Sequence, residues 1–133
     1  MLNCCHTWNH NKLLASNTSM VAVEDSYPVR PGHALVIPKR HILSIDRLSP
    51  AEGVDLLTLI RQVYALNRDT TSFTVAINDG VEAGRTVHHL HVHVIPRHKK
   101  DGLRGFFWPR QKYESDEEAA EFAARVRAAI DAV

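Results

Sequence analysis

Polar and apolar residues alternate strictly from His89 to Val94, and this pattern sets the first limit on the fold. Successive side chains of a β-strand point to opposite faces of a sheet. We therefore predict a strand over residues 87–95, with Leu90, Val92 and Val94 on a core face. The alternation requires a sheet, and it requires a second layer that covers the apolar face of that sheet.

Four other segments have the β-forming residues and the turn-forming neighbours that are typical of strands. They are residues 13–16, 20–24, 34–37 and 73–78. The last is followed by Asp79-Gly80, a strong turn signal, so its strand and the strand at 87–95 are expected to be antiparallel neighbours.

A helix is predicted over residues 50–66. Ser49 is a typical N-cap residue, proline follows it at the first helical position, and Glu52 completes a capping box. Asp55 and Arg61 are expected to face solvent. The apolar residues at helical spacing are expected to cover one face of the sheet: Val54, Leu57, Ile60, Val63 and Tyr64.

A second helix is predicted over residues 115–131, with acidic residues near its positive end and an apolar face formed by Phe122, Val126 and Ile130. The fold class is therefore α+β: an antiparallel sheet of about five strands with two helices packed on it. No repeat or linker divides the chain, so we predict a single domain over residues 1–133. Residues 1–12 form an irregular N-terminal arm in this prediction, and residues 97–114 form a basic loop.

Composition excludes several classes of protein. The 133 residues are 44% hydrophobic and carry a formal net charge of +1, which gives no general case for nucleic-acid binding. No apolar run approaches the roughly 18 residues of a membrane span. The first residues lack the layout of a signal peptide, and the two cysteines, Cys4 and Cys5, are adjacent. We expect a cytoplasmic protein with no membrane partner.

Histidine is abundant, with 9 in the chain, and five of them lie between His88 and His98. The predicted strand places His89, His91 and His93 on one face. Three imidazoles in a row are compatible with a hydrogen-bonded structural cluster, a solvent-facing stripe, a zinc site or a catalytic centre. The catalytic interpretation gains support from the neighbouring loop, where Asn78, Arg85, Thr86 and two glycines bring together groups that bind phosphate.

The segment His89-Leu90-His91-Val92-His93-Val94-Ile95 resembles the signature of the histidine triad (HIT) family. The similarity extends to residues 84–87 and to Pro96-Arg97. Residues 31–41 resemble the second conserved segment of that family, and residues 78–80 resemble its loop before the triad. The resemblance runs from about Met20 to Arg97, and it implies a HIT-like fold.

The resemblance also implies a nucleotide hydrolase that works through a covalent nucleotidyl-histidine. By similarity, His91 is the nucleophile, and His89 and His93 flank it. Asn78 and Thr86 match positions that serve the phosphates, Asp25 matches a position that binds the ribose hydroxyls, and His33 matches a histidine that supports the triad.

Arg85 departs from the family pattern, because many relatives carry glutamine there. A guanidinium at this position is expected to face the phosphate chain and to favour a longer polyphosphate. Cys4 and Cys5 lack the two-residue gap of the zinc-binding relatives, so no metal is expected. The basic loop is expected to hold far phosphates, and Phe106-Phe107-Trp108 to stack on a base or to anchor the loop.

A third histidine at position 93 is typical of the hydrolase branches of the family. We therefore expect hydrolysis of dinucleoside polyphosphates, such as diadenosine tri- or tetraphosphate, at the α-phosphate. Two alternatives stay open: a nucleoside phosphoramidase of the same family, and a non-catalytic module that binds nucleotide or zinc. The resemblance implies no cofactor for the chemistry itself, allows Mg²⁺ to accompany the substrate, and implies a homodimer.

Overall fold

The computed structural model describes residues 10–103 and 109–133. The chain divides into two compact units, Met1–Leu103 and Arg104–Val133, and each is described by itself. The prediction of a single domain over the whole chain therefore stays a prediction. So do the roles proposed for Cys4, Cys5 and Phe106-Phe107-Trp108, which lie outside the described residues.

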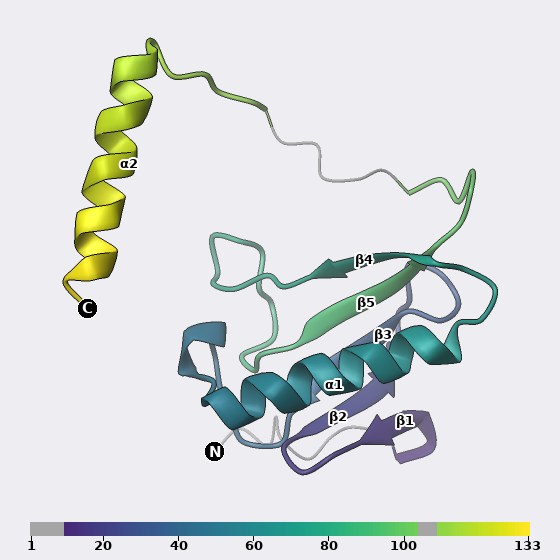
Figure 1. The fold of residues 1–133 in the computed structure, drawn as a ribbon. Coiled ribbons are helices and arrows are strands. Elements are labelled where there is room, and N and C mark those ends of the chain that lie inside the picture. The colour runs from purple at the N-terminus through teal and green to yellow at the C-terminus, as the bar shows by residue number, and fades with distance from the viewer. Residues whose placement is uncertain (1–9, 104–108) are drawn as a thin grey trace. The chain divides into compact units, whose positions relative to one another are not determined.

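The first unit contains a five-stranded antiparallel sheet, as predicted (Figure 1). Its strands are β1 Leu13–Ser16, β2 Met20–Glu24, β3 Ala34–Pro38, β4 Ser72–Ala76 and β5 Val92–Arg97. They lie in the order β1-β2-β3-β5-β4, and every neighbouring pair is antiparallel. β5 is the last strand in the sequence, yet it lies between β3 and β4, which places His93 inside the sheet.

Helix α1, Pro50–Leu66, covers one face of this sheet (Figure 1). The predicted capping box is present: Ser49 Oγ accepts a hydrogen bond from the backbone of Glu52, and the Glu52 carboxylate accepts one from the backbone of Ser49. Apolar side chains from both layers form the core: Met20, Ala22, Ala34, Val36, Leu56, Leu59, Val63, Val92 and Val94.

The face of α1 that packs on the sheet agrees only in part with the predicted one. Val63 is buried and Ile60 packs against the core, as predicted. Leu56 and Leu59 are buried as well, whereas Val54 and Leu57 are 65% and 62% exposed. The helix carries two apolar stripes, and local spacing cannot distinguish the stripe that meets the sheet from the one that does not. The prediction for Asp55 was also wrong, because its carboxylate is half-buried and accepts hydrogen bonds from the backbone and hydroxyl groups of Ser19.

The bounds of three strands also differ from the predictions. β3 ends at Pro38 rather than residue 37, and β4 covers residues 72–76 rather than 73–78. β5 covers residues 92–97 rather than 87–95, so it continues through Pro96. Beyond Val94, β5 pairs with β4 alone, and proline is tolerated where a strand has a neighbour on one side only.

The second unit contains helix α2, Asp116–Asp131, whose first turn is capped by the hydroxyl of Ser115. The sequence predicted this helix over residues 115–131. Its apolar face is exposed in this unit, with Phe122 46% exposed and Ile130 68% exposed. The expectation that α2 packs on the sheet stays a prediction. In the part of the chain that the structure describes, no helix combines the length and the apolar character that a membrane crossing requires.

Candidate active site

The candidate site lies around His93, at the point where β5 pairs with both β3 and β4. His93 in β5 pairs with Leu35 of β3 on one side and with Ala76 of β4 on the other. His33 directly precedes β3, and Asp25 directly follows β2. The backbone N–H of Asp25 donates to the carbonyl of His33 at 2.9 Å, which extends the β2–β3 ladder by one bond and holds these two residues side by side.

His91 and His93 form the first pair of rings. Their ring centroids are 5.1 Å apart, and the planes meet at 72°. His91 Nδ1 lies 2.8 Å from the carbonyl oxygen of His89. Because a carbonyl only accepts, His91 carries its proton on Nδ1, and the lone pair of the neutral ring is therefore on Nε2. An imidazole held in this way presents a nucleophilic nitrogen.

His89 lies apart from the shared face that the alternation predicts. Residues 87–91 precede β5, so the period of two does not hold for them. The His89 ring is buried, meets His41 edge-on at 5.1 Å, and donates from Nε2 to the carbonyl of Pro38 at 2.8 Å. Burial lowers the pKa of His89, although the bond to Pro38 opposes this effect. In its hydrogen bond with His91, His89 therefore contributes its backbone carbonyl rather than its ring.

His33 and His93 form the second pair of rings. Their Nε2 and Nδ1 atoms are 2.9 Å apart, and the backbone N–H of Val29 donates to His33 Nδ1 at 3.2 Å. Asp25 Oδ2 lies 3.4 Å from His33 Nε2. Burial lowers the pKa of both histidines below the usual 6.5. The neighbouring rings of His91 and His33 lower the pKa of His93 further. Both rings are therefore neutral at pH 7.

The side chains of Asp25, His33 and His93 also come close enough to suggest a metal site, since one ligand atom from each lies within 4.8 Å of the others. A histidine that binds a metal through one ring nitrogen normally donates the other N–H to a carboxylate or carbonyl. His33 Nδ1 instead faces the N–H of Val29, which is itself a donor. This second shell does not fit a metal ligand, so the cluster is better described as a hydrogen-bonded network.

The loop between β4 and the histidines is held by turns at Gly80 and Gly84, both with positive φ. Asn78 and Thr86 lie exposed on it. Arg85 is mostly buried: its Nη1 donates to the carbonyl of Leu43 at 2.7 Å, and its guanidinium lies 3.9 Å from Asp79. The guanidinium thus ties this loop to residues 40–47, and the two segments line a cavity of about 690 Å³.

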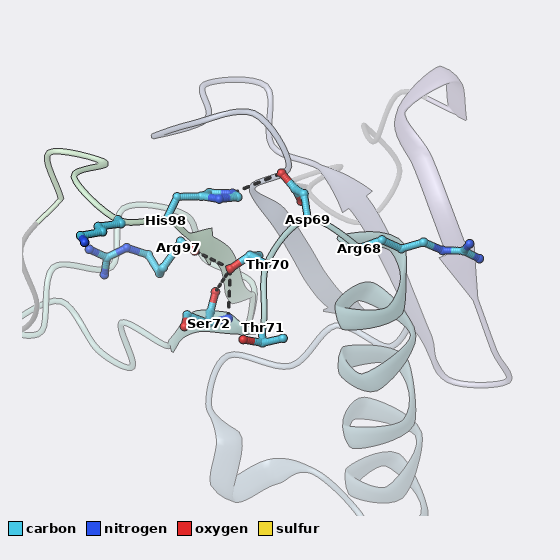
Figure 2. Close-up of a pocket in the computed structure, with 8 residues that line it drawn as sticks. Arg68, Asp69, Thr70, Thr71, Ser72, Arg97 and His98 are labelled. Carbon is cyan, nitrogen blue, oxygen red and sulfur yellow. Dashed lines mark hydrogen bonds and ion pairs between the residues drawn. The ribbon is translucent and has the colours of Figure 1, made fainter.

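A separate cavity of about 660 Å³ lies at the other end of the β4–β5 pair (Figure 2). Its floor is a turn in which Thr70 Oγ1 bonds the carbonyl of Arg97, and His98 pairs with Asp69 at 3.5 Å. In the β4–β5 register, Arg97 pairs with Ser72, whereas His93 pairs with Ala76. This cavity is therefore distinct from the histidine cluster.

The groups that the sequence did not reveal are backbone groups. The Val29 N–H and the carbonyls of Pro38 and His89 fix the orientation of the rings. Every residue of these types carries such groups, so no sequence signal marks them.

The fold and the histidine cluster together define a class of protein. The family described as "HIT domain" matches residues 7–100, which is more than half of the chain. The chain belongs to the histidine triad family.

Its relatives include named hydrolases. The chain is 46% identical over 77 residues to a bis(5'-nucleosyl)-tetraphosphatase [asymmetrical] of Schizosaccharomyces pombe, covering 56% of this chain and 42% of that protein. It is 40% identical over 77 residues to a bis(5'-adenosyl)-triphosphatase of Dictyostelium discoideum, covering 56% and 52%. The chain thus spans about half the length of the curated relatives it matches, or less.

A solved structure matches more completely. The structure of Plasmodium falciparum diadenosine triphosphate hydrolase in complex with Cyclomarin A superposes with a TM-score of 0.64 at 28% identity. The match covers 93% of this chain and 79% of that chain.

Proposed function

We propose that this protein hydrolyses dinucleoside polyphosphates at the α-phosphate and releases a nucleoside monophosphate. One observation carries the proposal: the hydrogen bond from His91 Nδ1 to the carbonyl of His89, which leaves the lone pair of a neutral imidazole on Nε2. The named activities of the Schizosaccharomyces pombe and Dictyostelium discoideum relatives support the same substrate class.

The reaction proceeds in two displacements. His91 Nε2 attacks the α-phosphorus, an N–P bond forms, and the P–O bond to the departing nucleotide breaks. Water then attacks the phosphorus, the N–P bond breaks, and the nucleoside monophosphate leaves with the oxygen of that water. A covalent intermediate divides one difficult displacement into two easier ones. The chemistry requires no cofactor, and Mg²⁺ would accompany the polyphosphate only as part of the substrate.

The remaining assignments concern substrate binding. Asp25 binds the ribose hydroxyls, and its position beside the His33–His93 pair supports this role. Asn78 and Thr86 contact the phosphates from an exposed loop. Arg85 supplies positive charge on the same loop, from a guanidinium that donates to the carbonyl of Leu43 and lies 3.9 Å from Asp79.

A trapping experiment tests the proposed function. The purified chain is incubated with diadenosine triphosphate, diadenosine tetraphosphate and adenosine phosphoramidate, and the reactions are quenched and analysed by mass spectrometry. We expect a nucleotidyl adduct on His91 and higher kcat/KM for the dinucleotides than for the phosphoramidate. Undiminished turnover by His91→Ala would refute the mechanism. His88→Ala serves as the control, because His88 is a neighbouring exposed histidine with no proposed role.

We also propose that the protein works as a homodimer. Val54 and Leu57 on α1 are exposed apolar residues, and β4 is an edge strand with Val75 40% exposed. An open sheet edge and an uncovered apolar helix face are each typical sites for pairing with a second copy. This assembly gives the exposed stripe of α1 a partner.

We further propose that the protein acts in the cytoplasm, because two adjacent cysteines cannot link distant segments and are compatible with a reducing compartment. The proposal is tested by imaging the tagged full chain in cells. Signal confined to a membrane-bounded compartment would contradict it.

A further inference from the structure

Four imidazoles near the proposed reaction centre each have at least one ring nitrogen assigned to a specific partner. His89 and His91 donate to backbone carbonyls, whereas His33 accepts from the backbone N–H of Val29. Among the described residues, the hydrogen-bond partner of the His93 ring is another ring, with His93 Nδ1 2.9 Å from His33 Nε2. The protonation pattern of His93 must therefore follow from that of His33.

The Val29 N–H fixes the first ring. A backbone N–H only donates, so His33 Nδ1 must be the acceptor and carries no proton. The proton of a neutral His33 is therefore on Nε2. The Asp25 carboxylate, 3.4 Å from the same Nε2, favours a proton at that position as well.

His33 then fixes the second ring. Since His33 Nε2 carries the proton, it donates to His93 Nδ1, and the proton of a neutral His93 is on Nε2. The opposite tautomer of His93 would place two N–H groups face to face at 2.9 Å. An unpaired donor in a partly buried site is costly, and two opposed donors are worse.

We infer that the backbone amide of Val29, acting through His33, fixes His93 as a hydrogen-bond donor at Nε2, beside the nucleophilic lone pair of His91. The inference rests on the proposed function, which it deepens by assigning His33 and Val29 as positioning groups. Neutral rings with opposite tautomers suit a phosphoryl group: the lone pair of His91 faces phosphorus, and the N–H of His93 is available to a phosphate oxygen.

The fixed pattern also explains why an N–H, and not a second lone pair, belongs at His93. A second lone pair at His93 Nε2 would repel the phosphate oxygens that surround the phosphorus atom that His91 attacks. A positioned donor instead favours the charge that develops on those oxygens. Loss of a single donor of this kind typically lowers kcat by about 100- to 1000-fold.

The tautomers can be measured directly, without substrate. Long-range ¹H–¹⁵N NMR of the full chain with ¹⁵N-labelled histidine distinguishes a protonated Nδ1 from a protonated Nε2. We expect protonated Nε2 for His33, His89 and His93, and protonated Nδ1 for His91. Single substitutions assign the signals. A protonated Nδ1 on His93 would overturn the inference.

Two variants of His33 separate positioning from bulk. His33→Gln places its amide near the position of Nε2 and keeps a donor toward His93, whereas His33→Asn places its amide near Nδ1 and removes that donor. We expect the His93 tautomers to mix in His33→Asn, with kcat falling about tenfold further than in His33→Gln and with little difference in KM. Equal kcat and equal His93 spectra in the two variants would also overturn the inference, provided that both fold.

The NMR result and the activity assay can fail separately. Absence of hydrolysis together with the expected tautomers would reject the proposed function and keep the tautomer chain. Hydrolysis together with the opposite His93 tautomer would reject the chain and keep the function. Added Zn²⁺ provides a last check: a shift of the His33 and His93 signals would show that the cluster takes a metal, which contradicts a fixed donor at Val29.

Discussion

A β-carbon on Gly32 would lie 2.7 Å from Oδ1 of Asn67 and 3.0 Å from Cγ of Pro96. Asn67 is held in place because it caps the end of α1 and its Nδ2 donates to the carbonyl of Val63 at 2.9 Å. Gly32 also has a φ of +88°, in the left-handed region that side chains disfavour. The residue that precedes His33 is therefore fixed as glycine both by its backbone and by its neighbours.

Gly32→Ala should destabilise the protein, and Gly53→Ala should not. A positive φ costs a residue with a β-carbon about 1–2 kcal/mol, and the contact with Asn67 adds to this cost. Gly53 lies within α1 with nothing within 4 Å of an added β-carbon, so alanine should raise the free energy of unfolding by about 0.5–1 kcal/mol. Chemical denaturation measures both effects. Equal stabilities for the two variants would contradict the described geometry of Gly32.

Asp55→Ala should weaken the attachment of α1 to the β1–β2 turn. The Asp55 carboxylate accepts bonds from the backbone and hydroxyl groups of Ser19, and hydrogen bonds to a charged group contribute about 1.5–3 kcal/mol. We expect the free energy of unfolding to fall by about 1–3 kcal/mol. Arg61→Ala on the exposed side of the same helix should change it by less than about 0.5 kcal/mol. A similar loss in both variants would show that the Asp55 contact contributes little.

Local signals predicted the elements whose ends are determined by local chemistry. The strands at Leu13–Ser16 and Met20–Glu24 and the helix at Pro50–Leu66 have the predicted bounds, because turns and a capping box determine where they begin and end. The five-stranded antiparallel sheet and the histidine triad family are likewise confirmed.

Tertiary pairing determined the features that the sequence did not predict. Residues 87–91 were predicted as the start of a strand, but among the described residues they pair with no strand; instead the N–H of Leu90 donates to the carbonyl of Ile42 at 2.7 Å. The buried stripe of α1 depends on which side meets the sheet, and Leu56 rather than Leu57 faces the core. The Val29–His33 contact joins a backbone amide to a ring nitrogen, and no residue pattern specifies it.

Leu57→Glu should convert the proposed homodimer to a monomer. Leu57 is 62% exposed on the apolar stripe of α1, where a second copy would cover it and a buried unpaired charge would be costly. Light scattering coupled to size exclusion measures the mass. Val81→Glu is the control, because Val81 is 63% exposed on a loop away from that stripe. A wild-type protein that is monomeric at micromolar concentration would contradict the proposal.

Arg85→Gln should shift the preference of the enzyme toward the shorter polyphosphate. The substitution removes a positive charge beside the loop that carries Asn78 and Thr86, and a longer phosphate chain gains more from that charge. We expect the ratio of kcat/KM for diadenosine tetraphosphate to that for the triphosphate to fall severalfold. Arg47 lines the same cavity, so Arg47→Gln is the matched control. An unchanged ratio in Arg85→Gln would limit the role of Arg85 to its bond with Leu43.

The stability of the protein should fall as the pH drops below about 6.5. Burial lowers the pKa of His33, His89 and His93 in the folded chain, whereas the usual value of 6.5 applies after unfolding. Between those values the unfolded chain binds more protons, so the free energy of unfolding rises with pH in this window and levels off above it. Each such histidine contributes a slope of up to about 1.4 kcal/mol per pH unit.

Denaturant titrations at pH 7.5, 6.5 and 5.5 measure the slope. His33→Gln should reduce it, whereas His88→Gln, which replaces an exposed histidine, provides the comparison. Stability that is independent of pH from 7.5 to 5.5 would contradict the burial of these rings.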